Sequence, residues 1–250
     1  GNGRAVGDNV NYDGFANSPY TIAVGAVNDR GTQTSYGEPG ACLVVSAPSG
    51  SSGLPRLTTC DLVGLNGASS GDYTTNFTGT SASTPLVSGT LALMLSVNPQ
   101  LNWRDAQEIL IRSAVRNDPT DLDWATNSAG FHFNHKYGAG LVDAAAAVEL
   151  ASHWQSLGHR ERATRDWSSA ALNIPDNQSN GVTLTLPVSA QDFRVEHVTL
   201  HVQLTHDDWG DLQIILRSPS GMSSVLAEPH SPSFGSGMDW TFLSVRHWGE

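Results

Sequence analysis

The segment that decides the fold is Thr78-Gly79-Thr80-Ser81-Ala82-Ser83-Thr84-Pro85, which leads directly into an apolar stretch with helical spacing. Apolar residues recur up to position 97, where Asn98-Pro99 ends the pattern, so we expect a buried helix over about 83–97. The turn of small residues places Ser81 where a helix start has unpaired N–H groups. Such groups stabilise an oxyanion, which makes Ser81 a candidate nucleophile, although an isolated serine at a helix start is more often a simple N-cap.

The surrounding sequence predicts alternating strands and helices. Short apolar or β-branched runs predict strands over 20–27, 42–47 and 56–62, the last two joined by a Gly/Ser-rich loop. Helical spacing follows over 103–115, where Asn102 is the expected N-cap, and over about 142–154. This mixture predicts an α/β domain over residues 1–156.

The pattern changes near residue 158. Residues 158–181 are polar and suit a linker or a leading strand. Short alternating segments then follow without helical spacing, at 182–186, 197–204, 211–216 and 224–226. Short strands separated by turn signals predict an all-β sandwich as a second domain over 160–250.

Composition narrows the possible partners. The chain has 250 residues, a net charge of −11 and 13 Lys plus Arg, so we do not expect it to bind nucleic acid. The charge suits a cationic substrate or a divalent cation, or it serves only solubility. No run of 18 apolar residues is present, so we expect no membrane span. Cys42 and Cys60 would face each other if their segments formed a hairpin; a disulfide and two free buried thiols are both compatible with the sequence.

Several motifs occur together in one order along the chain. Residues 78–85 match the pattern G-T-S-x-S/A-x-P, Gly1-Asn2-Gly3 matches the end of A-x-G-N, and 8–18 match D-x-x-x-x-D-G-Y-x-N-S. Further matches lie at 135–144, 195–198, 210–212, 218–221 and 239–242. With these motifs the chain resembles subtilisin-like serine proteases of the proprotein convertase (kexin/furin-like) branch. The resemblance implies the C-terminal part of a parallel-sheet protease domain, followed by an incomplete jelly-roll P domain.

The resemblance also implies roles for particular residues. Ser81 would attack the peptide carbonyl, and the side-chain amide of Asn2 would stabilise the oxyanion. Asp13 would be a buried carboxylate at the base of the S1 pocket that pairs with a basic P1 residue. Asp8 and Glu38 would bind Ca²⁺ beside that pocket. Without the resemblance, Asn-Gly and Asp-Gly are ordinary turn sequences and the acids are surface turn residues.

The sequence departs from the pattern at a few positions. Gly37 stands where the family usually has Ser, and Val10 replaces a cysteine that some members pair with the equivalent of Cys42. The partner of Cys42 is therefore open, with Cys60 as the substitute. We expect His135 to be a packed or hydrogen-bonded histidine of the scaffold.

The general base is missing from its expected place. In the subtilase order Asp and His precede Ser, but all 9 histidines follow Ser81. We therefore expect the His and Asp of the triad before Gly1 and no activity from this fragment alone. The implied protein is a secreted or extracytoplasmic monomer that cleaves peptides or proproteins after basic residues, with paired Arg/Lys sites expected. The alternatives are a pseudoprotease whose P domain is a binding module, and a subtilase with a different P1 preference.

Overall fold

The computed structural model describes residues 1–250 except 168–171, 176, 189–193 and 231–236. It divides into one unit formed by residues 1–157 and 195–250, and a second unit over 158–194. The described residues of the second unit contain no helix or strand, so the strand expected at 182–186 is wrong. That segment is almost entirely exposed and has no neighbouring strand to satisfy its backbone. The domain boundary expected near 156–160 remains a prediction.

A parallel strand pair forms the centre of the first unit. β1 (Ala23–Val27) pairs with β2 (Leu43–Pro48), and every residue of the pair except Pro48 is buried. Ser46 extends the pairing through a parallel bridge to Leu141. Strands buried on both faces are apolar throughout, which explains why these runs do not alternate.

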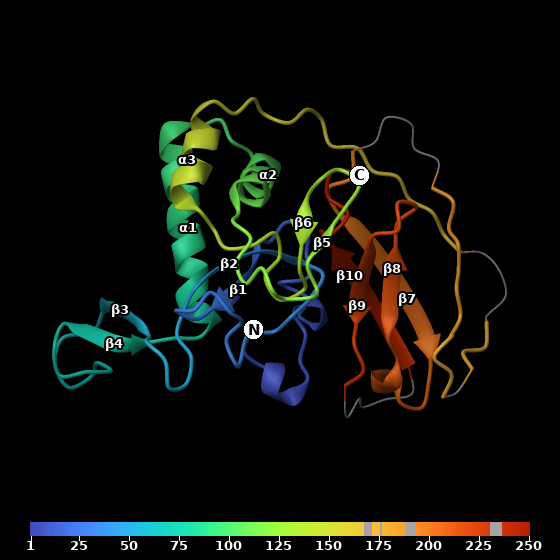
Figure 1. Cartoon of the computed structure of the whole chain (residues 1–250), viewed down its shortest axis with the longest axis horizontal. Helices are drawn as coiled ribbons and strands as arrows, with labels where there is room; N and C mark the ends of the chain where they lie inside the picture. The colour runs from blue at the N-terminus through green and yellow to red at the C-terminus, as the bar shows by residue number, and fades with distance from the viewer. Residues whose placement is uncertain (168–171, 176, 189–193, 231–236) are drawn as a thin grey trace. The chain divides into compact units, whose positions relative to one another are not determined.

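Three helices pack around this pair. They are α1 (Thr80–Val97), α2 (Trp103–Ser113) and α3 (Ala144–Ser152), and α1 contacts α3, β1 and β2 (Figure 1). The predicted cap of α2 is confirmed, because the Asn102 side chain accepts from the N–H groups of Arg104 and Asp105. In return Asp105 Oδ2 accepts from the Asn102 N–H at 2.9 Å, which completes a capping box.

Helix α1 differs from the expected helix in two ways. It begins at Thr80, so Ser81 lies inside its first turn. It is also less buried than expected: Val87 and Met94 face the core, whereas Leu86, Leu93 and Leu95 are 42%, 54% and 45% exposed. By length and composition alone α1 is long and apolar enough to cross a membrane. A single helix that meets this test is weak evidence of a membrane span, because core helices of other proteins meet it too. Its contacts with β1, β2 and α3 identify it as a core helix with one uncovered side.

Residues 42–47 and 56–62 do not form a hairpin, which was the condition for Cys42 and Cys60 to face each other. β2 pairs with β1, whereas β3 (Leu57–Cys60) pairs with β4 (Tyr73–Phe77), a strand that the sequence analysis did not predict. The disulfide is consequently not formed, and Cys42 and Cys60 are both free. Cys42 lies in the core, where burial raises the pKa of its thiol to about 12, and Cys60 is exposed.

The C-terminal residues form two antiparallel strand pairs. β7 (Val198–Thr205) pairs with β10 (Gly237–Ser244), and β8 (Ile214–Arg217) pairs with β9 (Ser223–Ala227). The pairs pack on a common apolar cluster around Leu226 and Phe242 (Figure 1). The shorter elements are β5 (Ala125–Thr126), β6 (His132–Phe133) and the 3₁₀ turns Arg4–Val6, Val10–Tyr12 and Trp209–Asp211.

The α/β part and the β part share polar contacts as well as a core. On α2, Arg104 makes a two-point ion pair with Glu196, and the carboxylate of Glu108 accepts from the indole N–H of Trp248. Trp248 is fully buried in the same apolar cluster as Ile109. Helix α2 therefore contacts the β part through both polar and apolar side chains.

Candidate active site

The turn that carries Ser81 is shaped by Gly79. Gly79 has a φ of 87° and ends its loop directly before Thr80, where α1 begins. A positive φ favours glycine, because an L side chain is strained there. Ser81 is exposed, and its hydroxyl forms no hydrogen bond with the described residues. The predicted nucleophile therefore lies accessible on the first turn of a helix.

The hydroxyl of Tyr36 holds the turn that carries Ser81 in place through hydrogen bonds. Tyr36 Oη lies 2.7 Å from Ser49 Oγ and 3.1 Å from Thr78 Oγ1, and it accepts from the Gly79 N–H at 3.0 Å. It also donates to the Gly50 carbonyl at 2.6 Å. One phenol thus ties together three loop segments around the nucleophile turn.

Two serines complete this support. Ser49 Oγ donates to the Gly79 carbonyl at 2.9 Å. Ser83 is buried, and its hydroxyl donates to the Ala47 carbonyl at 3.0 Å, which attaches the start of α1 to the end of β2. The sequence analysis did not identify Tyr36, Ser49 or Ser83 as supporting residues, because their contacts join segments that are distant in sequence.

Asn2 lies beside the start of α1. Its Oδ1 accepts from the Thr80 N–H at 3.0 Å and from the Thr80 hydroxyl at 3.1 Å. This bonding assigns the other atom, Nδ2, as the side-chain donor. A Cβ built on Gly79 would lie 3.4 Å from Asn2 Nδ2 and 3.6 Å from Ser81 N, so both donors border one small region. The glycine at 79 keeps that region free of a side chain.

Asp8 and Glu38 approach each other around Gly3. A Cβ on Gly3 would meet Asp8 Oδ2 at 2.8 Å and Glu38 Oε1 at 3.1 Å. Glu38 is buried and accepts from the Gly3 N–H at 2.7 Å, and the amino group of Gly1 lies 3.5 Å from its Oε2. Two carboxylates around one glycine are hard oxygen donors that suit Ca²⁺. Within the described residues, however, no group of three or more His, Cys, Asp or Glu forms a metal site.

Asp13 differs from its expected environment. It was expected to be buried, but it is exposed, and its Oδ1 accepts from the N–H groups of Phe15 and Ala16, both at 2.8 Å. This is the geometry of an acid that begins a turn. Its Oδ2 accepts no hydrogen bond from the described residues. Among the described residues, no contact joins Asp13 to Ser81 or Asn2.

The loop that contains Asp13 is attached to strand β10. The side chain of Asn11 donates to the Leu243 carbonyl at 2.7 Å, and Asn17 Oδ1 accepts from the Leu243 N–H at 2.7 Å. Asn17 Nδ2 also donates to the Thr241 carbonyl at 2.5 Å. Two asparagine side chains therefore take the place of a further strand along the free edge of β10.

His135 is a scaffold residue, as predicted. Its Nδ1 lies 2.9 Å from Asp123 Oδ1, and the Val225 N–H donates to its Nε2 at 2.9 Å. An N–H that donates to Nε2 leaves the proton on Nδ1, where Asp123 accepts it. Both ring nitrogens are thus occupied, and His135 is 7% exposed.

Comparison with known proteins gives consistent matches along the whole chain. It is 38% identical over 261 residues to human proprotein convertase subtilisin/kexin type 7, covering all of this chain and 32% of the relative. It is 37% identical over 268 residues to the dibasic-processing endoprotease of Schizosaccharomyces pombe, covering 36% of that protein. The chain thus spans about a third of the length of these relatives.

The solved structures agree with this result. The serine protease of Aeromonas sobria matches with a TM-score of 0.82 and 27% identity, over 97% of this chain and 51% of that one. Residues 195–250 match the proprotein convertase P-domain. Because residues 1–140 match the subtilase family, the chain belongs to that family of serine proteases and joins part of its protease fold to a P-domain.

Proposed function

We propose that this chain is the nucleophile-bearing part of a calcium-dependent serine endopeptidase that cleaves after basic residues. The observation that supports it most is the position of Asn2, whose Oδ1 accepts from the Thr80 N–H at 3.0 Å, immediately before Ser81. In this proposal Ser81 attacks the peptide carbonyl. Asn2 Nδ2 and the Ser81 N–H stabilise the oxyanion that develops.

A general base must take the proton of Ser81 for this attack to proceed. The histidines of the chain all follow Ser81, and His135 is occupied by Asp123 and Val225. We therefore propose that the base and its orienting acid come from residues outside 1–250. Residues 1–250 alone should then hydrolyse no peptide.

The acidic residues supply the remaining parts of the proposal. Asp13 has one carboxylate oxygen held by its turn and the other open, which suits contact with the cationic side chain of a P1 Arg or Lys. Asp8 and Glu38 would hold Ca²⁺, with further ligands from outside this pair because Ca²⁺ takes ~6–8 oxygens. Bound Ca²⁺ would neutralise the acids around Gly3. Secretory or extracytoplasmic localisation and a peptide or proprotein substrate follow from the same proposal.

The deciding experiment uses the protein together with its upstream region. Peptides matched except for Arg or Leu at P1 would be compared for kcat/KM, with and without a calcium chelator. Ser81→Ala should abolish turnover, and Asn2→Ala should lower kcat about 10²–10³-fold, as for other oxyanion donors. Asn76→Ala, which changes an exposed asparagine, is the matched control and should leave kcat unchanged.

Specificity is tested separately. Asp13→Ala should remove the preference for Arg over Leu while leaving cleavage of the Leu peptide intact. Asp29→Ala, at another exposed turn, should leave the preference unchanged. Equal selectivity of Asp13→Ala and the parent would refute the role of Asp13 and favour a different P1 preference. If the protein with an intact upstream His cleaves nothing, the pseudoprotease alternative is favoured.

A further inference from the structure

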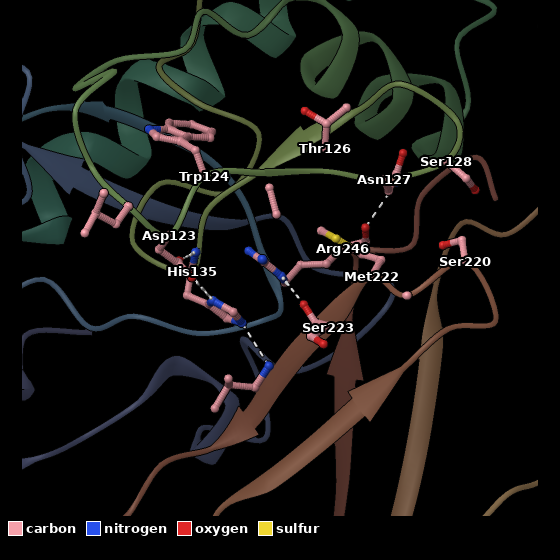
Figure 2. A pocket seen from close by; sticks show the side chains of 14 residues that line it. Asp123, Trp124, Thr126, Asn127, Ser128, His135, Ser220, Met222, Ser223 and Arg246 are labelled. Carbon is pink, nitrogen blue, oxygen red and sulfur yellow. Dashed lines mark hydrogen bonds and ion pairs between the residues drawn. The ribbon is translucent and has the colours of Figure 1, made fainter.

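A pocket of about 580 Å³ lies away from the Ser81 turn, between the loop 122–128 and the hairpin turn 220–223. Figure 2 shows its lining, which is mostly polar and includes Asp123, His135, Ser223 and Arg246. None of these residues belongs to the proposed catalytic arrangement. The pocket therefore requires a separate explanation.

Arg246 is the unusual member of this lining. It is 3% exposed, and Figure 2 shows its guanidinium extending from the end of β10 toward the loop that carries Asp123 and Trp124. Its Nε donates to the Ser223 carbonyl at 3.2 Å, whereas its buried Nη1 has no partner among the described residues. Burying a charged donor without a partner is costly, so native proteins almost always pair such groups.

The nearby carboxylates do not fill this role, because each is already engaged. Asp123 accepts from the His135 N–H at 2.5 Å and from His135 Nδ1 at 2.9 Å. It forms no ion pair with Arg246, although its charge partly opposes the lowering of the Arg246 pKa by burial. Glu250 accepts from Ser220 at 2.6 Å and from the Ser128 N–H at 3.2 Å. Arg246 Nη1 thus has no carboxylate partner among the described residues, and Arg246 lines the pocket.

We propose that this pocket binds a small oxyanion, a carboxylate or phosphate group, through Arg246, whose Nη1 has no partner among the described residues. A guanidinium edge presents parallel N–H donors that match two oxygens of such a group. Hydroxyls of Thr126 and Ser223 also line the pocket and offer further donors. Because its walls come from the loop 122–128, from the start of β9 and from Arg246, which follows β10, a bound anion would contact both parts of the fold.

The test measures binding of inorganic phosphate and of succinate to the chain by calorimetry, with chloride keeping ionic strength constant. Saturable binding of at least one of these ions is expected. Arg246→Gln should weaken it about tenfold or more, because hydrogen bonds to a charged group are lost. Arg217→Gln is the matched control. Arg217 is exposed and its Nε donates to Ser223 Oγ at 3.2 Å, but it does not line the pocket. The affinity of the Arg217→Gln variant for the ion should therefore equal that of the parent.

A second variant covers the case in which Arg246→Gln does not fold. Thr126→Trp places a large ring at the exposed rim of the pocket and leaves Arg246 in place. It should also reduce binding about tenfold or more by excluding the ion. The proposal is overturned if neither ion binds the parent chain. It is equally overturned if a folded Arg246→Gln or Thr126→Trp variant binds as tightly as the parent.

Discussion

The side chain of Asn11 is expected to be one of the most important single contributors to the stability of this chain. Asn11 is fully buried. Its Oδ1 accepts from the Ala41 N–H at 2.6 Å and the Cys42 N–H at 3.3 Å, and its Nδ2 donates to the Leu243 carbonyl at 2.7 Å. Asn11→Ala would leave these three backbone groups without their partner in a place that water does not reach.

The size of the effect follows from these contacts. Each buried backbone group left unsatisfied costs ~1 kcal/mol or more, so Asn11→Ala should lower the free energy of unfolding by about 3 kcal/mol. For a chain of 150–250 residues this corresponds to a fall in Tm of about 6–12 °C. Asn11→Asp should be at least as damaging, because it replaces the Nδ2 donor with an oxygen that faces the Leu243 carbonyl.

Urea unfolding followed by circular dichroism measures this difference. The midpoint should shift with little change in the slope m, since the surface exposed on unfolding stays the same. Asn76→Ala is the control, because Asn76 is exposed on β4 and its side chain makes no hydrogen bond with the described residues. If Asn11→Ala and Asn76→Ala unfold at the same urea concentration, the bridge between Asn11 and β10 does not contribute to stability and the reasoning is wrong.

Three further predictions concern other contacts. Tyr36→Phe should lower the free energy of unfolding by about 1–3 kcal/mol, measured in urea, because the phenol no longer satisfies Gly50 and Gly79; an unchanged midpoint would contradict this. A double-mutant cycle of Arg104→Ala and Glu196→Ala should give a coupling of about 0.5–3 kcal/mol, and purely additive losses would exclude an energetic link. Burial raises the pKa of Asp105, but hydrogen bonds from Leu157, Asn102, Ser156 and Trp154 outweigh it and hold the pKa below 3.8. Its stabilising contribution is therefore complete above pH 3.8 and lost as pH falls through the lower folded-state pKa, so the stability gap between Asp105→Asn and the parent should narrow in acid; a constant gap would refute it.

Local signals in the sequence were enough to predict several elements of the fold. The apolar spacing after Pro85 predicted α1, and Asn102 predicted the start of α2 with its cap, because both depend on residues within one or two helical turns. The burial of β1 also followed from its composition. The exposure of Leu86 and Leu93 on α1 could not be predicted. Spacing shows which residues of a helix are apolar, but it does not show which of them neighbouring elements cover.

Pairings between distant segments were harder to predict. The Gly/Ser-rich loop between Cys42 and Cys60 favoured a hairpin, yet β2 pairs with β1 and β3 with β4. In the parallel pair of β1 and β2 every residue except Pro48 is buried, whereas β3 is half-exposed. A loop rich in turn residues indicates that the chain changes direction, but it does not indicate which strand it meets next.

In the candidate site, too, contacts between distant segments could not be predicted from local sequence signals. Asn2 and Ser81 were linked only through a resemblance, and the structure brings their segments together through Thr80. The hydroxyl of Tyr36 could not be assigned from sequence, because its partners lie 13 to 43 positions away in two segments, 49–50 and 78–79. A tyrosine in a loop has many possible neighbours, and only the folded chain selects among them.

The stretch 8–18 illustrates why a motif can carry two kinds of information. Its acids, Asp8 and Asp13, match residues that would bind calcium and the P1 side chain, whereas its asparagines, Asn11 and Asn17, pair with the edge of β10. Asn11 and Asn17 lie on either side of Asp13 in the sequence, so the turn of Asp13 is held on both sides by contacts with β10. A change in β10 that displaces Leu243 should therefore move Asp13 as well, although the two residues are 230 positions apart in the sequence. This arrangement gives a physical reason for β10 to influence the loop proposed to select the substrate.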